Sequence, residues 1–290
     1  MLKFNPFISV IVPTYNDWDR LKLFLDAIKA QDYPSNKFEV LVVNNNPKEL
    51  PPFDIELYNI ILINENKPGS YAARNAAINI AKGDIFAFID SDCIPDQLWL
   101  YEGVKEIVSN EQNSIVAGFI NVFPKIKDCP NIFELFSIKY ELTQSIYVKN
   151  NRFATANVFI KKNVFETIGN FNSSLKSGGD FEFASRAVEK NFLISYCKSC
   201  IVSHPARSTY GDFKQKAIRK AGGIFDLNKS IFKMILSIFK SLIISCTQLI
   251  TSKISLIKKF KLIIILIINF FIKFFTIISL AVKKSKSERK

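Results

Sequence analysis

The stretch IFAFIDSDCIPD, residues 85–96, decides the fold class of this chain. A near-continuous apolar run is typical of a buried strand, so we expect residues 85–89 to form a central strand of a sheet that is covered on both faces. Two carboxylates, Asp90 and Asp92, follow this strand directly. Because ligands of open α/β sheets bind beyond the carboxyl ends of the strands, the two acids are expected at a binding site.

The D-x-D pattern of these acids has two interpretations. At a bend in the chain, both side chains can approach one hard cation with their oxygen atoms. The alternative is a polar turn that ends the strand, with Pro95 as the stop. The pattern by itself leaves both interpretations open, so the neighbouring segments have to decide between them.

Apolar runs alternate with helical patterns before this stretch. Strands are predicted at FISVIVPTYN, FEVLVVNNNP and NIILINEN, and helices at DWDRLKLFLDAIKAQDYP and SYAARNAAINIAKGD. This order predicts an α/β fold with a mainly parallel sheet and crossover helices. Later in the chain, NSIVAGFINVFP is expected to form a strand pair, ATANVFIKKNVFETIG a strand and a helix, and GGDFEF the start of a helix near Asp180.

The positive charge of the chain is concentrated at its end. Of the net charge of +13, residues 226–290 carry +11 and the remaining residues carry +2. A nearly neutral first part argues against a face that binds nucleic acid, and a basic, apolar tail points to an anionic membrane surface. We therefore predict a catalytic domain over residues 1–225 and a membrane-associating helical tail over residues 226–290.

The first residues and the cysteines indicate the compartment. MLKFNPFISVIVP is not expected to be a signal peptide, because its apolar run is short and is soon followed by Pro13. The five cysteines are scattered and odd in number, which indicates a reducing compartment without disulfides. Cys197 and Cys200 form a C-x-x-C motif, but no second pair or histidine cluster completes a zinc site.

The tail is expected to form two helices. From Lys229 to Lys258, polar residues recur every three or four positions as one stripe and apolar residues cover most of the rest, which is typical of a helix in a membrane interface. Residues 262–282 are long enough to span a bilayer, but Lys273 in their middle would cost about 2.5–3.5 kcal/mol. We expect two amphipathic helices on the cytoplasmic face of the cell membrane. A spanning helix or hairpin, and a soluble helical pair packed on the catalytic domain, are the alternatives.

Several motifs along the chain occur together in one known family. VIVPTYN, NKPGSYAARNAAINIAKGDIFAFIDSD, TANVFIKKNVFETIGNFN and GGDFEF are found in this order over about residues 7–224. In these motifs the chain resembles the family 2 glycosyltransferases, inverting enzymes of GT-A fold that use nucleotide-diphospho-sugars. The resemblance implies a Rossmann-like, mainly parallel sheet flanked by helices, and transfer of a sugar to a glycan or lipid-linked acceptor in cell-surface polysaccharide biosynthesis.

The resemblance also implies roles for individual residues. Asp92 would bind a divalent cation, Mn²⁺ or Mg²⁺, while Asp90 would hold the ribose or share the metal. Asp180 would be the general base, although Gly179 stands where the family usually has Glu. The residues implied in nucleotide binding are Pro13, Thr14, Tyr15, Asn16, Asn44 and Arg74.

Asn44 and Arg74 have alternatives. Asn44 stands where the family commonly has an Asp that accepts a hydrogen bond from uracil, and its amide can donate as well as accept. A UDP-sugar is therefore the first expectation for the donor, with GDP and other nucleotides left open. Arg74, in an alanine-rich helix, is either a nucleotide contact or an ordinary surface residue.

Four further candidates come later in the chain, and two of them, Glu182 and His204, also have a structural interpretation. Asn157 and Glu182 are implied in acceptor binding, and Glu182 is also well placed for a favourable interaction near a helix N-terminus. His204, the one histidine, either completes the metal site or is a structural histidine after a strand. Arg207 is a candidate clamp for the diphosphate, because its planar guanidinium suits phosphate.

Two other classes of protein compete with this interpretation. A degenerate protein that binds a nucleotide sugar or serves as a scaffold would explain Asn44 and Gly179, whereas the presence of Asp90, Asp92 and Asp180 argues against it. A nucleotidyltransferase would be expected to have a glycine-rich loop after its first strand, and PTYNDWDR contains no glycine.

Overall fold

The computed structural model describes residues 5–228 and 230–287, so Lys229, where the predicted polar stripe begins, lies outside it. The chain divides into two compact units. The first unit comprises the chain up to Asn121, Leu142–Ser174 and Gly179–His204. The second unit comprises Val122–Glu141, Leu175–Gly178 and the chain from Pro205 onward.

The first unit is built on an eight-stranded sheet with the order β3-β2-β1-β4-β7-β6-β8-β5. β1 pairs in parallel with β2 and β4, and β2 pairs in parallel with β3, while β7 runs antiparallel to β4 and β6. The predicted α/β fold is therefore confirmed, but the sheet is mixed rather than mainly parallel: β3, β2, β1 and β4 are parallel, whereas β7 is antiparallel to both of its neighbours. The strands are β1 (Ile8–Thr14), β2 (Phe38–Asn44), β3 (Ile61–Asn64), β4 (Ile85–Ile89), β5 (Ile94–Pro95), β6 (Asn113–Phe123), β7 (Asn157–Lys161) and β8 (Leu193–Pro205).

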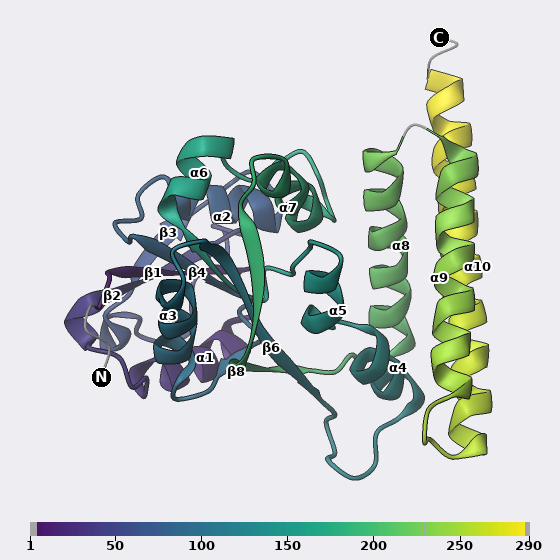
Figure 1. Ribbon diagram of the computed structural model, residues 1–290, viewed down its shortest axis with the longest axis horizontal. Coiled ribbons are helices and arrows are strands. Elements are labelled where there is room, and N and C mark those ends of the chain that lie inside the picture. The colour runs from purple at the N-terminus through teal and green to yellow at the C-terminus, as the bar shows by residue number, and fades with distance from the viewer. Residues whose placement is uncertain (1–4, 229, 288–290) are drawn as a thin grey trace. The chain divides into compact units, whose positions relative to one another are not determined.

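Helices cover both faces of this sheet (Figure 1). On one face, residues of α2, α6 and α7 join a single hydrophobic cluster with the strands, and on the other face Trp99 of α3 packs on Phe159 of β7. The helices of the first unit are α1 (Trp18–Lys29), α2 (Ser70–Ile78), α3 (Trp99–Ser109), α5 (Gln144–Lys149), α6 (Lys162–Ile168) and α7 (Gly179–Glu189), with short 3₁₀ turns at Ser35–Lys37 and Glu56–Tyr58.

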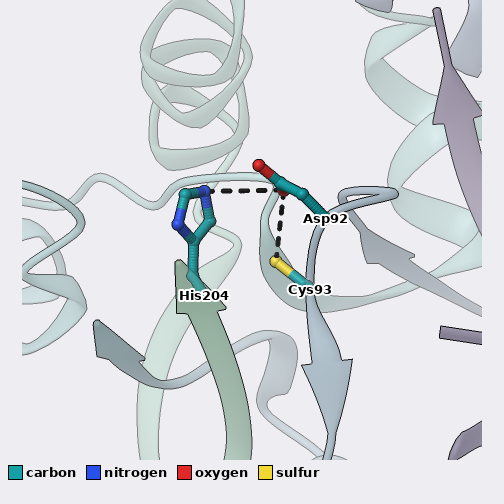
Figure 2. A group of neighbouring side chains, drawn as sticks. All are labelled: Asp92, Cys93 and His204. Atoms are coloured by element: carbon teal, nitrogen blue, oxygen red, sulfur yellow. Dashed lines mark hydrogen bonds and ion pairs between the residues drawn. The ribbon is translucent and has the colours of Figure 1, made fainter. Parts of the chain in front are cut away.

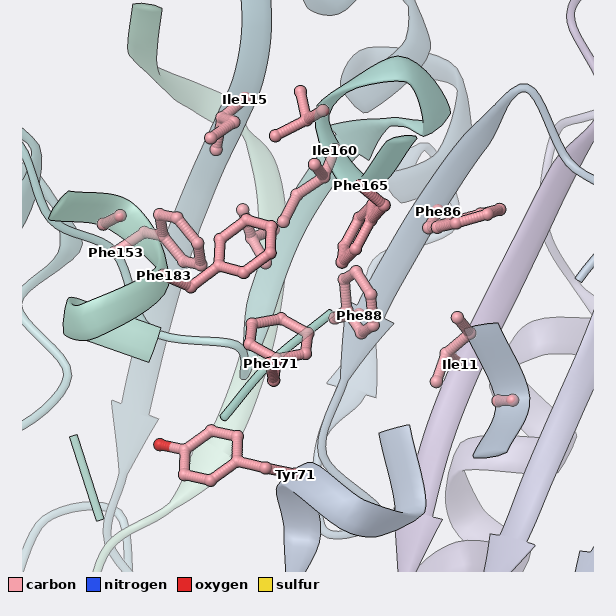
Figure 3. Packing of buried hydrophobic residues seen from close by; sticks show 14 of the residues in the cluster. Ile11, Tyr71, Phe86, Phe88, Ile115, Phe153, Ile160, Phe165, Phe171 and Phe183 are labelled. Carbon is pink, nitrogen blue, oxygen red and sulfur yellow. The ribbon is translucent and has the colours of Figure 1, made fainter. Parts of the chain in front are cut away.

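Aromatic rings hold β4 in the core (Figure 3). Phe88 packs edge-on against Phe171 with ring centroids 5.4 Å apart, and Phe171 lies 4.6 Å from Phe183. Phe86, two residues before Phe88 and so on the same face of the strand, contacts Phe165 of α6. Burial of each such side chain contributes about 1.5–3 kcal/mol. The acids after β4 therefore extend from a firmly packed strand.

The segment predicted as a strand pair forms one long strand instead, β6. Its central glycine, Gly118, does not make a turn. A Cβ atom on Gly118 would lie 2.3 Å from the amide nitrogen of Asn157, so the glycine is there to admit a neighbouring side chain. The pattern of small and apolar residues therefore reflects close packing within the sheet.

The second unit consists of four helices: α4 (Ile132–Tyr140), α8 (Tyr210–Leu227), α9 (Ile231–Ile250) and α10 (Leu256–Ser287). α10 packs along both α8 and α9 (Figure 1). Phe136 of α4 and Phe213 of α8 share a buried cluster with Leu262 and Leu266 of α10. This unit therefore contains α4 and α8 as well as the predicted tail, because the apolar faces of these helices are buried against α10.

The two tail helices are divided differently from the prediction. The stripe was expected to continue to Lys258, whereas α9 ends at Ile250 and α10 begins at Leu256. At this break the hydroxyl of Thr251 donates to the carbonyl of Thr247 at 3.2 Å, and that of Ser252 donates to the carbonyl of Leu249 at 2.6 Å. Hydroxyl groups that bond to the backbone in this way favour helix ends.

Candidate active site

The polar residues predicted to converge stand at neighbouring strand ends. Thr14 ends β1 and Asn44 ends β2, and the two residues are paired in the parallel register. Asp90 and Asp92 follow β4, which pairs with the other side of β1. The carboxyl ends of three adjacent parallel strands therefore supply one edge of the candidate site.

The loop after β1 provides a polar wall. Pro13 is half-buried, and the hydroxyl of the buried Thr14 has no hydrogen-bond partner in the described part of the chain. Tyr15 is 65% exposed. Asn16 adopts a left-handed conformation with φ of 54° and accepts a hydrogen bond from Asn46 at 2.9 Å. An unsatisfied buried hydroxyl beside an exposed ring is a suitable place for a ligand to bind.

Asn44 has a structural role in the loop after β2. The side chain is fully buried. Its amide nitrogen donates to the carbonyl of Glu49 at 2.9 Å, and its amide oxygen accepts from the backbone N–H of Asn46 at 3.0 Å. Both polar atoms form hydrogen bonds inside the loop, and contact between Asn44 and the nucleotide base stays a prediction.

Arg74 is neither a surface residue nor a freely exposed ligand for the nucleotide. Its side chain is only 3% exposed, and its Nη2 atom lies 2.6 Å from Oδ1 of Asp90. The Nε atom of Arg74 has no partner among the described residues. A charge-assisted hydrogen bond of this length holds the Asp90 carboxylate in place. Any effect of Arg74 on a nucleotide is therefore expected to act largely through Asp90.

Asp92 lies beside His204, which comes from the distant strand β8 (Figure 2). Nε2 of the buried His204 is 3.6 Å from Oδ1 of Asp92, and the Cys93 thiol is 3.9 Å from the same oxygen. One ligand atom from each of these three residues lies within 4.8 Å of the others. Two ligands of one six-coordinate ion at about 2.1 Å would be about 3 Å apart, so small shifts would let Asp92 and His204 share an ion.

Cys93 is less suitable than its two neighbours as a ligand. Burial raises the pKa of its thiol well above the ordinary value, and the charges of Asp90 and Asp92 raise it further. A protonated thiol is a poor ligand, and hard cations that bind diphosphate prefer oxygen. The carboxylate and imidazole therefore form the donor set that fits a divalent cation.

Asp180 lies in the first turn of α7, where it contacts Tyr71 of α2. The Tyr71 hydroxyl donates to Oδ1 of Asp180 at 3.2 Å, and the backbone N–H of Phe181 donates to the same oxygen at 3.0 Å. Burial raises the pKa of Asp180, while Arg74 and these hydrogen bonds partly oppose the rise. Asp90 and Asp180 are thus both under the influence of the Arg74 guanidinium.

Gly179 allows this contact to form. A Cβ atom at this position would lie 2.7 Å from a ring carbon of Tyr71, closer than side-chain atoms normally approach. The Glu that the family usually has at this position would therefore collide with the Tyr71 ring. The departure from the family pattern is explained by a neighbour that is distant in sequence.

Asn157 is part of the core of the sheet. It is fully buried, and its amide oxygen accepts from the Trp99 indole at 2.9 Å. Its amide nitrogen donates to the carbonyls of Phe119 at 2.9 Å and Cys200 at 3.0 Å. These bonds engage both polar atoms of the side chain within the sheet, and the acceptor contact stays a prediction.

Glu182 and Arg207 both form ion pairs. Glu182 lies 2.7 Å from Nε of Arg186, one helical turn later in α7. Arg207 belongs to the second unit, where its guanidinium lies 2.8 Å from Glu141. Glu182 remains a candidate for acceptor binding, whereas the charge of Arg207 is already opposed by a carboxylate within its own unit.

Sequence reasoning missed Tyr71 as a functional candidate. Tyr71 precedes Arg74 by three positions, so both side chains lie on the same face of α2. This spacing in SYAARN was the available signal. The distance from Tyr71 to Asp180 along the chain meant that only the folded structure could identify its partner.

Comparison with known proteins identifies the family. The profile of "Glycosyl transferase family 2" matches residues 9–169, which include β1, β4 and both acids that follow it. The chain belongs to this family. It is a glycosyltransferase, and the resemblance noted in its motifs is confirmed.

Two named relatives illustrate the match. Glycosyltransferase AglE of Haloferax volcanii is 36% identical over 225 residues, which cover 75% of this chain and 73% of the relative. A Methanococcus voltae glycosyltransferase is 24% identical over 228 residues, covering 73% and 71%. Its name is dolichyl N-acetyl-alpha-D-glucosaminyl phosphate 3-beta-D-2,3-diacetamido-2,3-dideoxy-beta-D-glucuronosyltransferase.

Solved structures support the same fold. The mannosyltransferase PcManGT of Pyrobaculum calidifontis, in complex with GDP-Man and Mn²⁺, matches with a TM-score of 0.58 at 19% identity, over 98% of this chain and 76% of that one. Residues 1–349 of S. aureus TarS with UDP match with a TM-score of 0.53 at 20% identity, over 79% and 68%. The predicted GT-A fold is confirmed.

Proposed function

We propose that this glycosyltransferase moves a sugar from a nucleotide-diphospho-sugar to an acceptor hydroxyl with inversion of configuration. The observation that carries the proposal is the pair of carboxyl groups, Asp90 and Asp180, that come from different elements and share the influence of Arg74. The unpartnered hydroxyl of Thr14 and the exposed ring of Tyr15 support a nucleotide pocket at the end of β1.

In the proposed reaction, the acceptor hydroxyl gives its proton to a carboxylate oxygen of Asp180 while the acceptor oxygen attacks the anomeric carbon. The bond between that carbon and the diphosphate oxygen breaks, and the nucleoside diphosphate leaves with the electron pair. A single displacement of this kind inverts the configuration. The raised pKa of Asp180 supports its role, because a base whose pKa approaches the working pH holds the transferred proton better.

Asp92 and His204 are the residues that we propose for binding a divalent cation, with Asp90 held beside them by Arg74. A divalent cation at such a site supplies positive charge to a departing diphosphate. A carboxylate oxygen together with an imidazole nitrogen suits Mn²⁺ better than Mg²⁺, which prefers oxygen ligands. The Mn²⁺ in the PcManGT complex is in keeping with this choice.

The nucleotide base is open between uracil and guanine. One structural neighbour is a complex with GDP-Man and another is a complex with UDP. Asn44, which the motif resemblance implies in contact with the base, is buried and hydrogen-bonded inside its own loop, so it favours neither base. We therefore propose UDP- and GDP-sugars as the donors to compare first.

We propose that the acceptor is a glycan or lipid-linked saccharide at the cytoplasmic face of the cell membrane. The name of the Methanococcus voltae relative describes a sugar carried on dolichyl phosphate, which supports an acceptor of this class. A membrane-bound enzyme would meet such an amphiphilic acceptor directly.

The exposed apolar side chains of α9 and α10 support binding to a membrane. Several large apolar residues on these helices are 63–81% exposed, namely Phe232, Ile250, Leu256, Ile257, Phe260 and Phe275. A soluble helical pair would leave this surface in water, so this alternative is disfavoured. By length and composition, Ile231–Ile250 and Leu256–Lys283 could each also cross a bilayer. We favour the interfacial arrangement because both helices carry polar side chains along their length.

The first experiment is calorimetric titration of the full chain in detergent with UDP, GDP and their sugar conjugates, with and without Mn²⁺. Asp92→Asn is expected to weaken metal-dependent binding by at least the about 10–100-fold typical of groups that only support a ligand, because it replaces a charged carboxylate ligand by a neutral amide. Asp128→Asn, at an exposed aspartate of the second unit, is the matched control and should change nothing. Asp180→Asn should retain nucleotide binding and reduce the rate of transfer about 10²–10⁴-fold.

The second candidate function is a degenerate protein that binds nucleotide sugars without transferring them. Two departures from the family pattern support this candidate: Gly179 in place of Glu and Asn44 in place of Asp. The Tyr71 ring accounts for the first, because it leaves no room for a larger side chain at Gly179. Nucleotide binding with no transfer to any acceptor would favour this candidate. If the folded protein binds no nucleotide, the donor site proposed here is refuted.

A further inference from the structure

A cavity of about 110 Å³ lies inside the second unit, among α4, α8, α9 and α10. In this measure about 10–15 Å³ is enough for one water molecule, so the cavity is large enough for a small anionic group. Exposed Ser241 of α9 is part of the lining, so the cavity reaches the surface. The other polar residues that line it are Tyr140, Glu141, Lys216, Lys220, Ser245, Asn269 and Lys273.

Glu141 is the one acidic residue in this lining, and its charge is already balanced. The Glu141 carboxylate lies 2.8 Å from Nη1 of Arg207 and 3.2 Å from Nζ of Lys216, and it accepts a hydrogen bond from Ser137 at 2.7 Å. Lys220 and Lys273 line the same cavity and form no ion pair with a carboxylate among the described residues. Four cations are therefore gathered around one anion.

The pKa values in this cluster reflect the excess of positive charge. Burial alone would raise the pKa of Glu141, yet Lys216, Arg207 and Lys220 hold it well below its ordinary value. The pKa of Lys216 is lowered to about 7, mainly by burial and also by Arg207 and Lys220, while Glu141 opposes the change. A second anion in the cavity would relieve this repulsion.

The cavity explains why a lysine, Lys273, lies in the middle of the apolar helix α10. In the sequence it interrupts an apolar segment, where a lysine that faced lipid would be costly. In the structure Lys273 and Asn269, one turn apart on α10, both line the cavity. These two polar positions of α10 therefore line the same cavity as Lys216 and Lys220 of α8.

We propose that this cavity binds a phosphate group through Lys216, Lys220 and Lys273. Ammonium groups are point charges that bind phosphate oxygens well. Phe136, Phe213 and Leu266 line the same cavity, and α9 and α10 expose apolar side chains nearby in the chain, so a phosphate carried by a lipid fits better than the free ion. This site is separate from the residues proposed for sugar transfer and does not depend on them.

The test measures thermal unfolding of the full chain in inorganic phosphate, compared with chloride at equal ionic strength. Phosphate is expected to raise the unfolding midpoint of the wild type. Lys220→Gln and Lys273→Gln should reduce this effect to that of chloride, and without phosphate they should unfold at the wild-type midpoint or above it, because they relieve repulsion. The matched control, Lys261→Gln, replaces an exposed lysine of α10 outside the cavity and should behave as the wild type.

A second arm identifies the source of the phosphate. Phosphatidylcholine vesicles containing phosphatidic acid are compared in cosedimentation with vesicles containing phosphatidylserine at matched surface charge. A lipid phosphate predicts that Lys273→Gln binds phosphatidic acid vesicles about tenfold more weakly while its binding to phosphatidylserine is unchanged. If Lys273→Gln loses the response to inorganic phosphate but binds both kinds of vesicle as the wild type does, the site binds the free ion.

The proposal is overturned if phosphate acts no differently from chloride on the wild type, or if Lys220→Gln and Lys273→Gln respond to phosphate like Lys261→Gln. It is also overturned if both lysine variants unfold at lower temperature without phosphate, since these lysines would then serve the packing of the helices. Calorimetric titration of the nucleotide donor with Lys273→Gln should give wild-type affinity, which separates this test from that of the proposed function.

Discussion

At the scale of residues, the contact between Tyr71 and Asp180 is the feature that distinguishes this site. The hydroxyl of Tyr71 donates to the proposed base, and Gly179 leaves room for the ring. Phe171 supports the ring from the core, with centroids 5.8 Å apart (Figure 3). The hydroxyl is therefore held in place, and a small change there is expected to alter the base itself.

Tyr71→Phe is expected to shift the pH dependence of transfer. The hydroxyl stabilises the charged form of Asp180 and so lowers its pKa, which burial has already raised above the ordinary 3.8. Without the hydroxyl the pKa rises further, so the acid limb of kcat/KM should move to higher pH and the rate at low pH should fall about tenfold. Tyr101→Phe is the control, because the Tyr101 hydroxyl forms no hydrogen bond with the described residues 5–228 and 230–287. An unchanged acid limb would argue against Asp180 as the base.

Gly179→Ala is expected to destabilise the first unit. The added methyl group would meet the Tyr71 ring at 2.7 Å, and overpacking of this kind typically costs about 1–3 kcal/mol. Gly222→Ala is the contrasting variant, since no atom lies within 4 Å of its new methyl group, and in a helix interior it should stabilise by about 0.5–1 kcal/mol. Unfolding in urea measures both. Equal effects of the two variants would contradict the steric explanation.

At the scale of elements, α4 and α8 meet through charges as well as apolar residues. Glu141 directly follows α4, and Lys216 is on α8, with only 5% and 10% of their side chains exposed. A buried ion pair of this kind contributes little net stability while it is intact and costs several kcal/mol when one partner is removed. Protonation of Glu141 is therefore expected to lower the stability of the packing between α4 and α8.

The second unit is expected to lose stability in acid. The pKa of folded Glu141 lies below its ordinary value of 4.5, so near pH 4.5 the unfolded chain binds a proton that the folded chain does not. The stabilising contribution is complete above that pH and is lost as the pH falls. Measured from pH 7 to pH 3, the free energy of unfolding should fall more steeply for the wild type than for Glu141→Gln. Equal slopes would show that this carboxyl group is not the cause.

At the scale of the whole molecule, apolar exposure and positive charge both concentrate at the end of the chain. Residues 226–290 carry +11 of the net charge, and the same segment carries the highly exposed apolar residues of α9 and α10. The proposed membrane binding would therefore combine hydrophobic insertion and attraction to anionic lipid on one segment. Membrane binding should belong to this segment and should weaken with salt.

Leu256→Ser is expected to weaken binding to anionic vesicles without changing the unfolding midpoint. Leu256 is 81% exposed, so the folded protein gains little from it, whereas burial of a leucine in lipid contributes about 1.5–3 kcal/mol, or about tenfold or more in partitioning. The same substitution at Leu50, which is 71% exposed in the first unit, is the control. Cosedimentation with vesicles measures the partitioning of both variants. Equal partitioning of Leu256→Ser and Leu50→Ser would contradict membrane binding by α10.

The sequence by itself determined the local features of this protein. The apolar run of residues 85–89 corresponds to β4, and the polar residues after β1, β2 and β4 stand at strand ends as predicted. The spacing of apolar residues, the turn residues and each motif depend on residues that are close together in the chain. Such patterns are sufficient to predict the sheet, its parallel half and the family.

Only the tertiary structure decided which polar side chains are available for chemistry. Asn44 and Asn157 match positions of interest in the sequence, yet packing buries them and their hydrogen bonds are used internally. In contrast, His204 is brought to Asp92 and Tyr71 to Asp180 across long stretches of chain. Burial and contacts between distant residues depend on how the elements pack, and no short pattern in the sequence records that packing.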